Sequence, residues 1–403
     1  MIVWSYWPLP TGGAEAQCRK LSHELVRQGI ACSVLTSRQR YEDASRADDQ
    51  GVRVIRVPVV QILLNQILKC RRSPRASVLK GAGAGIPLGN IREPWLSWLS
   101  HWLNCWSFML GAFWHLLRNK PEYDVLHVHI ADWLAGYTAL LGRWFKIPVV
   151  CKAANMPPLT PLKSWVPFRY LLDKQRSRMH FVALHDQMRA SLIEQGVGED
   201  FIQVIPNGVL IPPCQSSPVN GKYVLCVANF SQGAAHKAFD VLLHAWSLIA
   251  KEFPAEKLMM AGAGDDLQWK TLARQLGVAE SVVFPGYVSD HAVLYGEAKL
   301  LVLPSRHEGI SNVLLEAQAW GVPAIVSDIP GNRLVVVDGE TGRIVPVGNV
   351  STLAQEVGTF LKDSGLLATC GRRARLRVEE TFSIVSTARA YSNLYQSLMN
   401  KRI

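Results

Sequence analysis

The amino-acid sequence predicts an α/β protein made of two doubly wound domains with parallel sheets. Short apolar runs alternate with amphipathic helical segments along most of the chain, which is the pattern of repeated β–α–β units. The pattern starts with a strand at residues 2–5 and starts again at 223–228. The Pro- and Ser-rich stretch at 212–218 between them is typical of an interdomain linker. A length of 403 residues also suits two domains better than one.

We therefore expect an N-terminal domain at 1–211 and a C-terminal domain that begins at 219. Further elements follow from hydrophobic periodicity and from the Gly and Pro residues that interrupt it. The predicted helices lie at about 14–28, 186–195, 311–321 and 383–399. The predicted strands lie at 31–36, 52–57, 124–130, 149–152, 181–184, 202–205, 257–261, 282–288, 300–303 and 322–326.

The composition is that of a folded globular protein, with 49% hydrophobic and 19% charged residues. The eight cysteines are scattered, with no C-x-x-C pair and no metal-ligand spacing. This usage is typical of reduced thiols. The start M-I-V-W-S-Y-W lacks the basic residues and the long apolar core of a signal peptide. We expect a cytoplasmic protein.

The positive charge lies almost wholly in the first half of the chain. Of a net charge of +11, residues 1–205 hold 25 Lys and Arg against 15 Asp and Glu, whereas residues 206–403 hold 18 against 17. Such a basic half favours anionic partners. No nucleic-acid-binding motif accompanies it, so no nucleic acid is expected, and a membrane surface or a phosphorylated acceptor ranks first. One basic run contains Lys69, Arg71, Arg72, Arg75 and Lys80.

Residues 95–117 contain no Asp, Glu, Lys or Arg and are long enough to span a membrane. Polar side chains at His101, Asn104 and His115 favour an amphipathic helix instead. Packing of its apolar stripe on the sheet is favoured, and peripheral attachment to an anionic membrane, by this helix or by the basic run, stays open. The predicted stripe consists of Trp95, Trp98, Leu99, Trp102, Trp106, Met109, Phe113 and Leu117.

Residues 124–130 form a predicted buried strand that carries two histidines. Alternation places His127 and His129 on one face of the sheet, and His129 lies nearer the carboxyl end, where open α/β sheets bind ligands. Asp132 follows closely. At the first helix, Gly12 and Gly13 let the backbone come close to a ligand.

The segment 304–331 organises the second domain. Glu308 lies in the loop after the strand at 300–303, and Glu316 lies more than one turn inside the following helix. The N–H groups of Asn312, Val313 and Leu314 form a positive helix end that suits phosphate. Two carboxylates on either side of an anion site fit a sugar nucleotide.

This segment resembles the E-x7-E signature of retaining GT-B glycosyltransferases of the bacterial group 1 type, which use nucleotide-activated sugars. The resemblance implies that Glu308 faces the donor sugar, together with Gly309. It also implies that the backbone at 312–314 holds the diphosphate and that Glu316 binds the ribose. H-V-H-I-A-D-W resembles the family's H-x-H motif, which assigns His129 to the transferred sugar.

Other segments resemble the same family. The loop G-G-A-E at Gly12 and Gly13 would flank the donor diphosphate. In A-N-F-S-Q-G-A-A-H-K-A-F-D, Lys237 keeps the phosphate-contacting lysine, whereas Asn229 replaces an arginine and Ala238 replaces a glycine. Arg306 could approach the space of the missing arginine.

Two further segments complete the implied donor site. A-G-A-G-D resembles the glycine loop beside the nucleotide and contains Gly262 and Gly264. V-V-F-P-G-Y-V resembles the segment whose backbone reads the base and ends at Val288. In relatives the last helix, here within 381–403, crosses from the C-terminal domain at 219–380 back to the N-terminal domain.

The implied function is transfer of a hexose-type sugar, with retention, from a nucleotide-diphosphate sugar to a glycan or lipid-linked acceptor. Bacterial surface polysaccharide or glycolipid synthesis is the expected setting. The resemblance implies a cleft between the two domains as the site. No D-x-D or metal-ligand spacing occurs, so we expect no metal and no cofactor. A catalytically weak nucleotide-sugar-binding protein, or an epimerase or phosphorylase of the same fold, stays open as an alternative.

Overall fold

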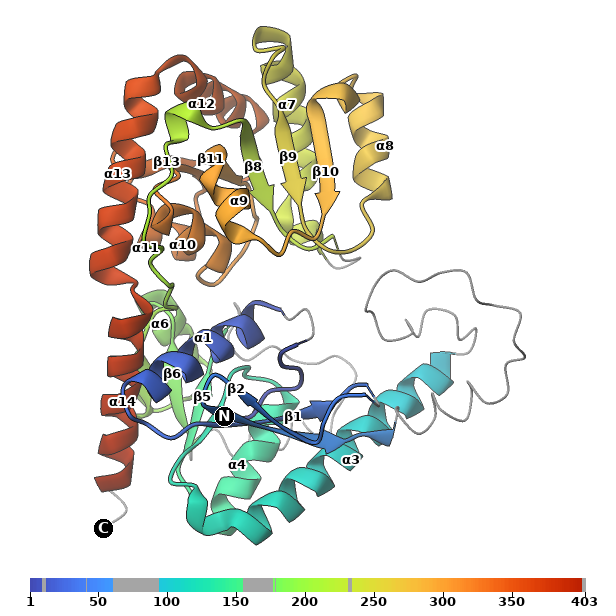
Figure 1. Ribbon diagram of the computed structural model, residues 1–403, viewed down its shortest axis with the longest axis vertical. Coiled ribbons are helices and arrows are strands. Elements are labelled where there is room, and N and C mark those ends of the chain that lie inside the picture. Colours follow the sequence, from blue (N-terminus) through green and yellow to red (C-terminus); the bar gives the residue numbers. More distant parts are fainter. Residues whose placement is uncertain are drawn as a thin grey trace. The chain divides into compact units, whose positions relative to one another are not determined.

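The computed structural model describes residues 1–8, 12–40, 42–60, 94–154, 177, 179–230 and 234–400 (Figure 1). The chain forms two compact units. Both contain sheets of mainly parallel strands with helices packed on them, which confirms the predicted fold class. Unit 1 consists of Met1–Ala183, Arg189–Val204 and Ala388–Ile403, and unit 2 consists of Leu184–Met188 and Ile205–Thr387.

The passage between the units differs from the expected linker. Residues 212–218 are fixed to unit 2, because the Arg375 guanidinium donates to the carbonyl oxygens of Pro212 and Cys214 at 2.8 and 3.0 Å. A segment held in this way is not a free hinge. The chain belongs to unit 1 again from Ala388 onwards.

Unit 2 is built on a six-stranded parallel sheet with the strand order β10-β9-β8-β11-β12-β13. Counted from the first strand of the unit, this order is 3-2-1-4-5-6, the doubly wound arrangement in which the chain reverses direction across the sheet between β8 and β11. The strands are β8 (Tyr223–Val227), β9 (Leu258–Ala261), β10 (Val282–Gly286), β11 (Ala298–Leu303), β12 (Ala324–Ser327) and β13 (Gly342–Val345).

Helices cover this sheet and supply its core. Trp246 of α7 is fully buried, and its indole N–H donates to the Ser281 hydroxyl at 3.0 Å, so its polar atom is satisfied inside the core. The helices are α7 (Phe239–Glu252), α8 (Leu267–Gln275), α9 (His291–Gly296), α10 (Asn312–Ala319), α11 (Pro330–Val335), α12 (Val350–Lys362) and α13 (Ser364–Thr381).

Unit 1 contains two sheets joined by the start of the chain. Ile2 forms parallel bridges with Leu35 and Val128, and thereby links the sheet β1-β3-β2 to the parallel sheet β4-β5-β6-β7. In the predicted strand at 2–5, bonding to β1 continues from Val3 N–H to the Leu35 carbonyl and from Ser37 N–H to the Trp4 carbonyl, both 3.1 Å. The bond to β4 runs from Ile2 N–H to the His127 carbonyl, 2.7 Å, so the segment forms a bridge and not a full strand of that sheet. The strands are β1 (Ser33–Arg38), β2 (Arg46–Asp49), β3 (Val52–Pro58), β4 (Leu126–Val128), β5 (Val149–Lys152), β6 (His180–Ala183) and β7 (Ile202–Val204).

The helices of unit 1 are α1 (Gly13–Arg27), α3 (Pro94–Asn119), α4 (Trp133–Phe145) and the later part of both α6 (Asp186–Glu194) and α14 (Ile384–Asn400). The described helices include none that is long and apolar enough to cross a membrane. The basic run at 69–80 lies outside the described residues.

Helix α3 packs on unit 1 with a face that coincides only in part with the predicted stripe. The side chains of Trp95, Trp98 and Leu99 of that stripe lie outside the described residues. Among its described side chains, Asn104, Cys105, Phe108, Met109, Ala112 and Leu116 are buried. Trp106 and Leu117, which belong to the predicted stripe, are exposed. A β-carbon on Gly111 would lie 2.1 Å from the Val57 side chain, so the small residues at 111–112 let the helix approach β3 closely. The sequence is apolar on both faces, and this close approach selects the buried one.

Two histidines at β4 and a tyrosine of α14 form a buried polar cluster in unit 1. The rings of His127 and His129 stack with centroids 4.2 Å apart, which agrees with their predicted common face. The Tyr395 hydroxyl of α14 lies 2.6 Å from His127 Nδ1. Burial holds the pKa of both histidines well below the ordinary value, so both are neutral.

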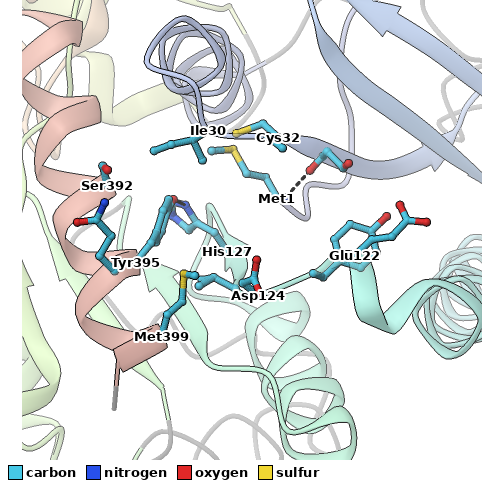
Figure 2. Close-up of a pocket in the computed structure, with 14 residues that line it drawn as sticks. Met1, Ile30, Cys32, Glu122, Asp124, His127, Ser392, Tyr395 and Met399 are labelled. Carbon is cyan, nitrogen blue, oxygen red and sulfur yellow. Dashed lines mark hydrogen bonds between the residues drawn. The ribbon is translucent and has the colours of Figure 1, made fainter. Parts of the chain in front are cut away.

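His127 lines a cavity of about 300 Å³ between β4 and α14, which Figure 2 shows beside Tyr395 and Met399. Ser33 and Asp124, which stand at or before the starts of β1 and β4, also line it. The cavity therefore lies at the amino ends of these strands, whereas open α/β sheets bind ligands at the carboxyl ends. His127 belongs to the framework, and His129 follows the end of β4.

The buried histidines predict a loss of stability in acid. A histidine whose pKa is lower in the folded than in the unfolded chain contributes stability that is present above about pH 6.5 and is lost as the pH falls. We expect the free energy of unfolding in urea to fall between pH 7 and pH 5, by up to about 1.4 kcal/mol per pH unit for each histidine. Burial raises the pKa of Asp132 to about 6, and this carboxyl opposes the fall below that pH.

The measurement compares the wild type with His127→Asn and His129→Asn. Each substitution should flatten the dependence of unfolding free energy on pH. His244→Asn changes an exposed histidine of α7 and should leave it unchanged. Equal slopes in all four proteins would contradict the assignment of the acid sensitivity to this cluster.

Candidate active site

The candidate site of unit 2 lies at the carboxyl ends of β8 and β11, the neighbouring strands at which the winding reverses. Ligands of doubly wound sheets bind at this point, because the loops after the two strands diverge there. The loop after β8 leads to the turn Ala234–Lys237, and the loop after β11 carries Glu308. These loops contain the residues on which the predicted chemistry depends.

Glu308 and Lys237 come together although they are 71 positions apart in sequence. The Lys237 ammonium forms an ion pair with the Glu308 carboxylate, and the Ser305 hydroxyl donates to the same carboxylate oxygen at 3.1 Å. Both side chains are partly exposed, 23% and 16%. A cation and a carboxylate that a ligand can reach are therefore held at one point.

The amino end of α10 lies directly after this loop. Ser311 is the N-cap residue, but its side chain makes no capping hydrogen bond. The first bond of the helix runs from Leu315 N–H to Ser311 O at 3.2 Å, and the preceding amides, including those of Val313 and Leu314, point along the axis. This end has the partial positive charge that favours an anion.

Asn207 fixes this helix start. Its side-chain amide donates to the Ile310 carbonyl at 3.0 Å and to the Asn312 side-chain oxygen at 3.2 Å. The sequence placed Asn207 in the expected N-terminal domain at 1–211 and assigned it no role. Asn207 belongs to unit 2, and these bonds let it position the helix end that is expected to hold the diphosphate.

Glu316 lies on α10 and accepts a hydrogen bond from the Tyr295 hydroxyl at 2.9 Å. Burial, reinforced by the charge of Glu316, raises the pKa of Tyr295 well above its ordinary value, so the hydroxyl keeps its proton and donates. Tyr295 fixes the direction of the carboxylate that is expected to bind ribose. The sequence offered no motif for it.

Close backbone contacts require glycine at the two predicted loop positions, Gly262 and Gly264. A β-carbon on Gly262 would lie 1.8 Å from the Ala228 carbonyl oxygen. Gly264 has a φ of +117° and would meet the Phe230 carbonyl at 2.6 Å. The loops after β8 and β9 therefore touch through their backbones, and a side chain at either position would force them apart. Val288 is half-buried after β10, and Asn229 is exposed after β8.

Ala238 adopts a left-handed conformation, with φ 53° and ψ 43°, directly before α7. Glycine takes this conformation at no steric cost, whereas a residue with a β-carbon pays about 1–2 kcal/mol. The position where the resembling family has glycine therefore keeps the backbone geometry that glycine permits.

Arg306 lies beside the same turn, but its charge is already engaged. Its guanidinium pairs with the Asp240 carboxylate at 2.8 Å and donates to the Ala235 carbonyl at 2.7 Å. It thus braces the turn that carries Lys237. Nothing in its position makes it a direct substitute for the arginine replaced by Asn229.

Polar contacts behind the site hold its loops. The Ser327 hydroxyl donates to the Ser305 carbonyl, and the Asn332 amide donates to the Ser327 carbonyl at 2.9 Å. A β-carbon on Gly331 would lie 1.6 Å from the Gly309 carbonyl oxygen. Asn332 is buried, and a buried amide needs such partners, but its burial follows from the fold and is not visible in the sequence.

In unit 1, ionisable groups gather near the carboxyl ends of β4 and β5. His129 is fully buried, and neither ring nitrogen has a hydrogen-bond partner among the described residues. Asp132 caps α4 by accepting from Leu134 N–H at 2.9 Å. Burial lowers the pKa of Lys152, at the end of β5, to about 8.

The Glu15 carboxylate lies at the helix end where Gly12 and Gly13 were predicted to approach the donor diphosphate. A β-carbon on Gly12 would lie 2.9 Å from a carboxylate oxygen of Glu15. Backbone N–H groups of Gly12 and Glu15 hydrogen-bond this carboxylate, although burial still raises its pKa. Glu15 of the G-G-A-E loop was missed by the sequence reasoning and itself occupies the amino end of α1.

Within the described residues, no group of three His, Cys, Asp or Glu side chains is placed to hold a metal ion.

Comparison with known proteins follows this geometry. A family model described as glycosyl transferase 4-like domain matches residues 12–208, and one described as glycosyl transferases group 1 matches residues 221–363. The chain is 30% identical over 278 residues to phosphatidyl-myo-inositol mannosyltransferase of Mycolicibacterium smegmatis, which covers 66% of this chain and 70% of that protein. The chain spans about half the length of some curated relatives and 98% of another.

Solved structures show the same architecture. Sucrose-phosphate synthase from Thermosynechococcus elongatus matches with a TM-score of 0.73 and 20% identity, over 97% of this chain and 94% of that chain. Anabaena HepE, in complex with UDP and glucose, matches with a TM-score of 0.70 and 17% identity, over 98% of each chain. The chain therefore belongs to the group 1 glycosyltransferases and has the GT-B fold.

Proposed function

We propose that the protein transfers a hexose-type sugar, with retention of configuration, from a nucleotide-diphosphate sugar to a glycan or lipid-linked acceptor. The observation that carries this proposal is the meeting of Lys237 and Glu308 beside the amino end of α10. The mannosyltransferase relative is named for a lipid acceptor, and HepE holds UDP and glucose. A setting in bacterial surface polysaccharide or glycolipid synthesis, at the inner face of the membrane, belongs to the same proposal.

The chemistry assigned to unit 2 follows from its charges. The bond between the anomeric carbon and the diphosphate oxygen breaks, and the acceptor oxygen takes its place on the same face of the sugar. Negative charge develops on the departing diphosphate, and its leaving oxygen takes the proton from the acceptor hydroxyl. Lys237 and the α10 amides are fixed positive groups that stabilise this charge.

The carboxylates have separate roles in this proposal. Glu308 orients the sugar hydroxyls, and Glu316, aligned by Tyr295, accepts from the ribose hydroxyls. The backbone near Gly262, Gly264 and Val288 flanks the nucleotide. His129, neutral and without a hydrogen-bond partner among the described residues, is proposed to contact the transferred sugar.

A nucleotide-sugar-binding protein with weak or no catalysis is the second candidate. The observations that favour it are the exposed Asn229 in place of arginine and the pairing of Arg306 with Asp240. Calorimetric binding of a donor without turnover on any acceptor would support it. An epimerase or phosphorylase would instead form product without an acceptor or with free phosphate.

Glu308→Gln should lower turnover by about 100-fold or more, because the site loses a charge held where the reaction occurs. The matched control is Glu256→Gln, since Glu256 pairs with Lys299 at 2.5 Å with comparable exposures of 19% and 20%. Initial rates with radiolabelled donor measure both. Loss of activity in the control alone, or near-normal activity in Glu308→Gln with folding intact, would refute the catalytic assignment.

Chelation of divalent metal should leave the rate unchanged, because fixed protein charges replace a metal in stabilising the diphosphate. Rates are measured after dialysis against EDTA and again after Mg²⁺ or Mn²⁺ is restored. A rate that collapses on chelation and recovers with metal would overturn the metal-independent mechanism. A sugar product with inverted configuration by NMR would overturn retention.

Glu316→Gln should weaken nucleotide-sugar binding by about 10- to 100-fold, the worth of hydrogen bonds to a charged group. Thermal shift with UDP, GDP and ADP first identifies the base, and calorimetry then measures the affinity. Glu356→Gln is the control, because Glu356 pairs with Arg343 at 3.2 Å on α12. Equal donor affinity in the two variants would remove the ribose role of Glu316.

A further inference from the structure

Two helices of unit 1 expose a row of large apolar side chains. Trp106, Leu110, Trp114 and Leu117 of α3 are 40%, 57%, 53% and 48% exposed, and Trp144 of α4 is 70% exposed. We call these five residues the tryptophan ridge. Scattered exposed apolar residues are normal on protein surfaces, whereas a continuous apolar patch marks an interaction site.

The ridge is continuous across both helices. Positions 106, 110, 114 and 117 follow each other at helical spacing, so they share one side of α3. The ring of Phe113 lies 6.2 Å from Trp114 and 5.8 Å from Trp144, both edge-on, and connects the two helices. The Tyr137 hydroxyl of α4 also donates to the Met109 carbonyl of α3. The helices therefore present one rigid surface.

The charges beside the ridge are positive. Neither α3 nor α4 contains Asp or Glu. Arg118 lies over the Trp114 ring at 5.8 Å, and Arg143 and Lys146 are exposed next to Trp144. The nearest acid that follows α3, Glu122, is paired with Arg53 at 2.5 Å.

We propose that the tryptophan ridge docks on the headgroup layer of an anionic lipid bilayer. Tryptophan is favoured at this depth because its ring is apolar and its N–H is polar, and Arg and Lys are attracted by anionic headgroups. Helix α3, with 26 residues, is about 39 Å long and would lie in the plane of the surface. Complementary charge selects this occupant over a second copy of the chain, whose same face would be equally positive.

The tryptophan ridge shares only Trp106 and Leu117 with the stripe expected from the sequence. Met109 and the neighbouring buried residues pack inside unit 1, and the opposite side of α3 faces outwards. The proposal also goes beyond the proposed activity, because lipid binding by unit 1 requires neither a donor nor turnover.

The test uses the full chain and vesicles of phosphatidylcholine alone or with one quarter phosphatidylglycerol. The wild type should float with the anionic vesicles and stay unbound with the neutral ones. Trp114→Ser with Trp144→Ser should lower partitioning at least tenfold, and Arg118→Gln with Arg143→Gln and Lys146→Gln should abolish the preference for anionic lipid. Leu248→Ser with Leu376→Ser removes exposed leucines of unit 2, 46% and 51% exposed, and should change nothing.

Thermal unfolding and donor affinity of each variant establish that it is folded. Lipids brominated on their acyl chains should quench tryptophan fluorescence in the wild type. They should quench it less in the variant Trp114→Ser with Trp144→Ser, called the ridge variant. Absence of anionic-vesicle binding by the wild type, or equal binding by the ridge variant, would overturn the proposal. A dimer in sedimentation that the ridge variant converts to monomer would assign the surface to a second copy instead.

Discussion

The candidate site depends on how the loop between β11 and α10 is held. This loop must place a carboxylate and an uncapped helix end side by side, and an uncapped end is costly unless other groups fix the chain. Asn207 supplies bonds to Ile310 and Asn312, and the Ser327 hydroxyl holds the Ser305 carbonyl. Gly331 admits the Gly309 carbonyl at a distance that any side chain would exclude. The amides of Val313 and Leu314 therefore stay available without a side-chain cap.

The sequence predicted five strands and one helix of unit 2, because their signals are local, but it made no prediction for β13 or for the other helices of that unit. Apolar runs, caps and glycines located β8 to β12 and α10 within a few residues, and the motif around Glu308 indicated the candidate site. The partners of those residues were not predictable. Tyr295 and Asn207 reach Glu316 and Asn312 from distant positions, and a long-range contact leaves no periodic trace in the chain. The bracing of Arg306 by Asp240 was hidden for the same reason.

In unit 1, ambiguity arose where a helix is apolar on more than one side. Helix α3 offers two apolar faces, and the choice between them depends on the small residues that meet Val57 of β3. Hydrophobic periodicity identified the helix but not its rotation. The histidine pair shows the converse case, since strand alternation alone placed His127 and His129 on a common face. Only the contact with Tyr395 distinguished the framework histidine from its neighbour.

The ion pair between Lys237 and Glu308 has a consequence for an enzyme waiting for its substrate. In the proposed donor complex, the Lys237 ammonium would bind phosphate oxygens in place of the carboxylate. The Glu308 carboxylate would accept hydrogen bonds from sugar hydroxyls in place of the ammonium. Neither group would stand bare before or after the exchange, so little water must be reorganised around an isolated charge. A ligand with only the phosphate would pair with Lys237 and leave Glu308 without a counter-charge. A ligand with only the sugar would bind Glu308 and leave Lys237 without one. The ion pair would thus favour the intact nucleotide sugar over a ligand that carries only one of its two parts.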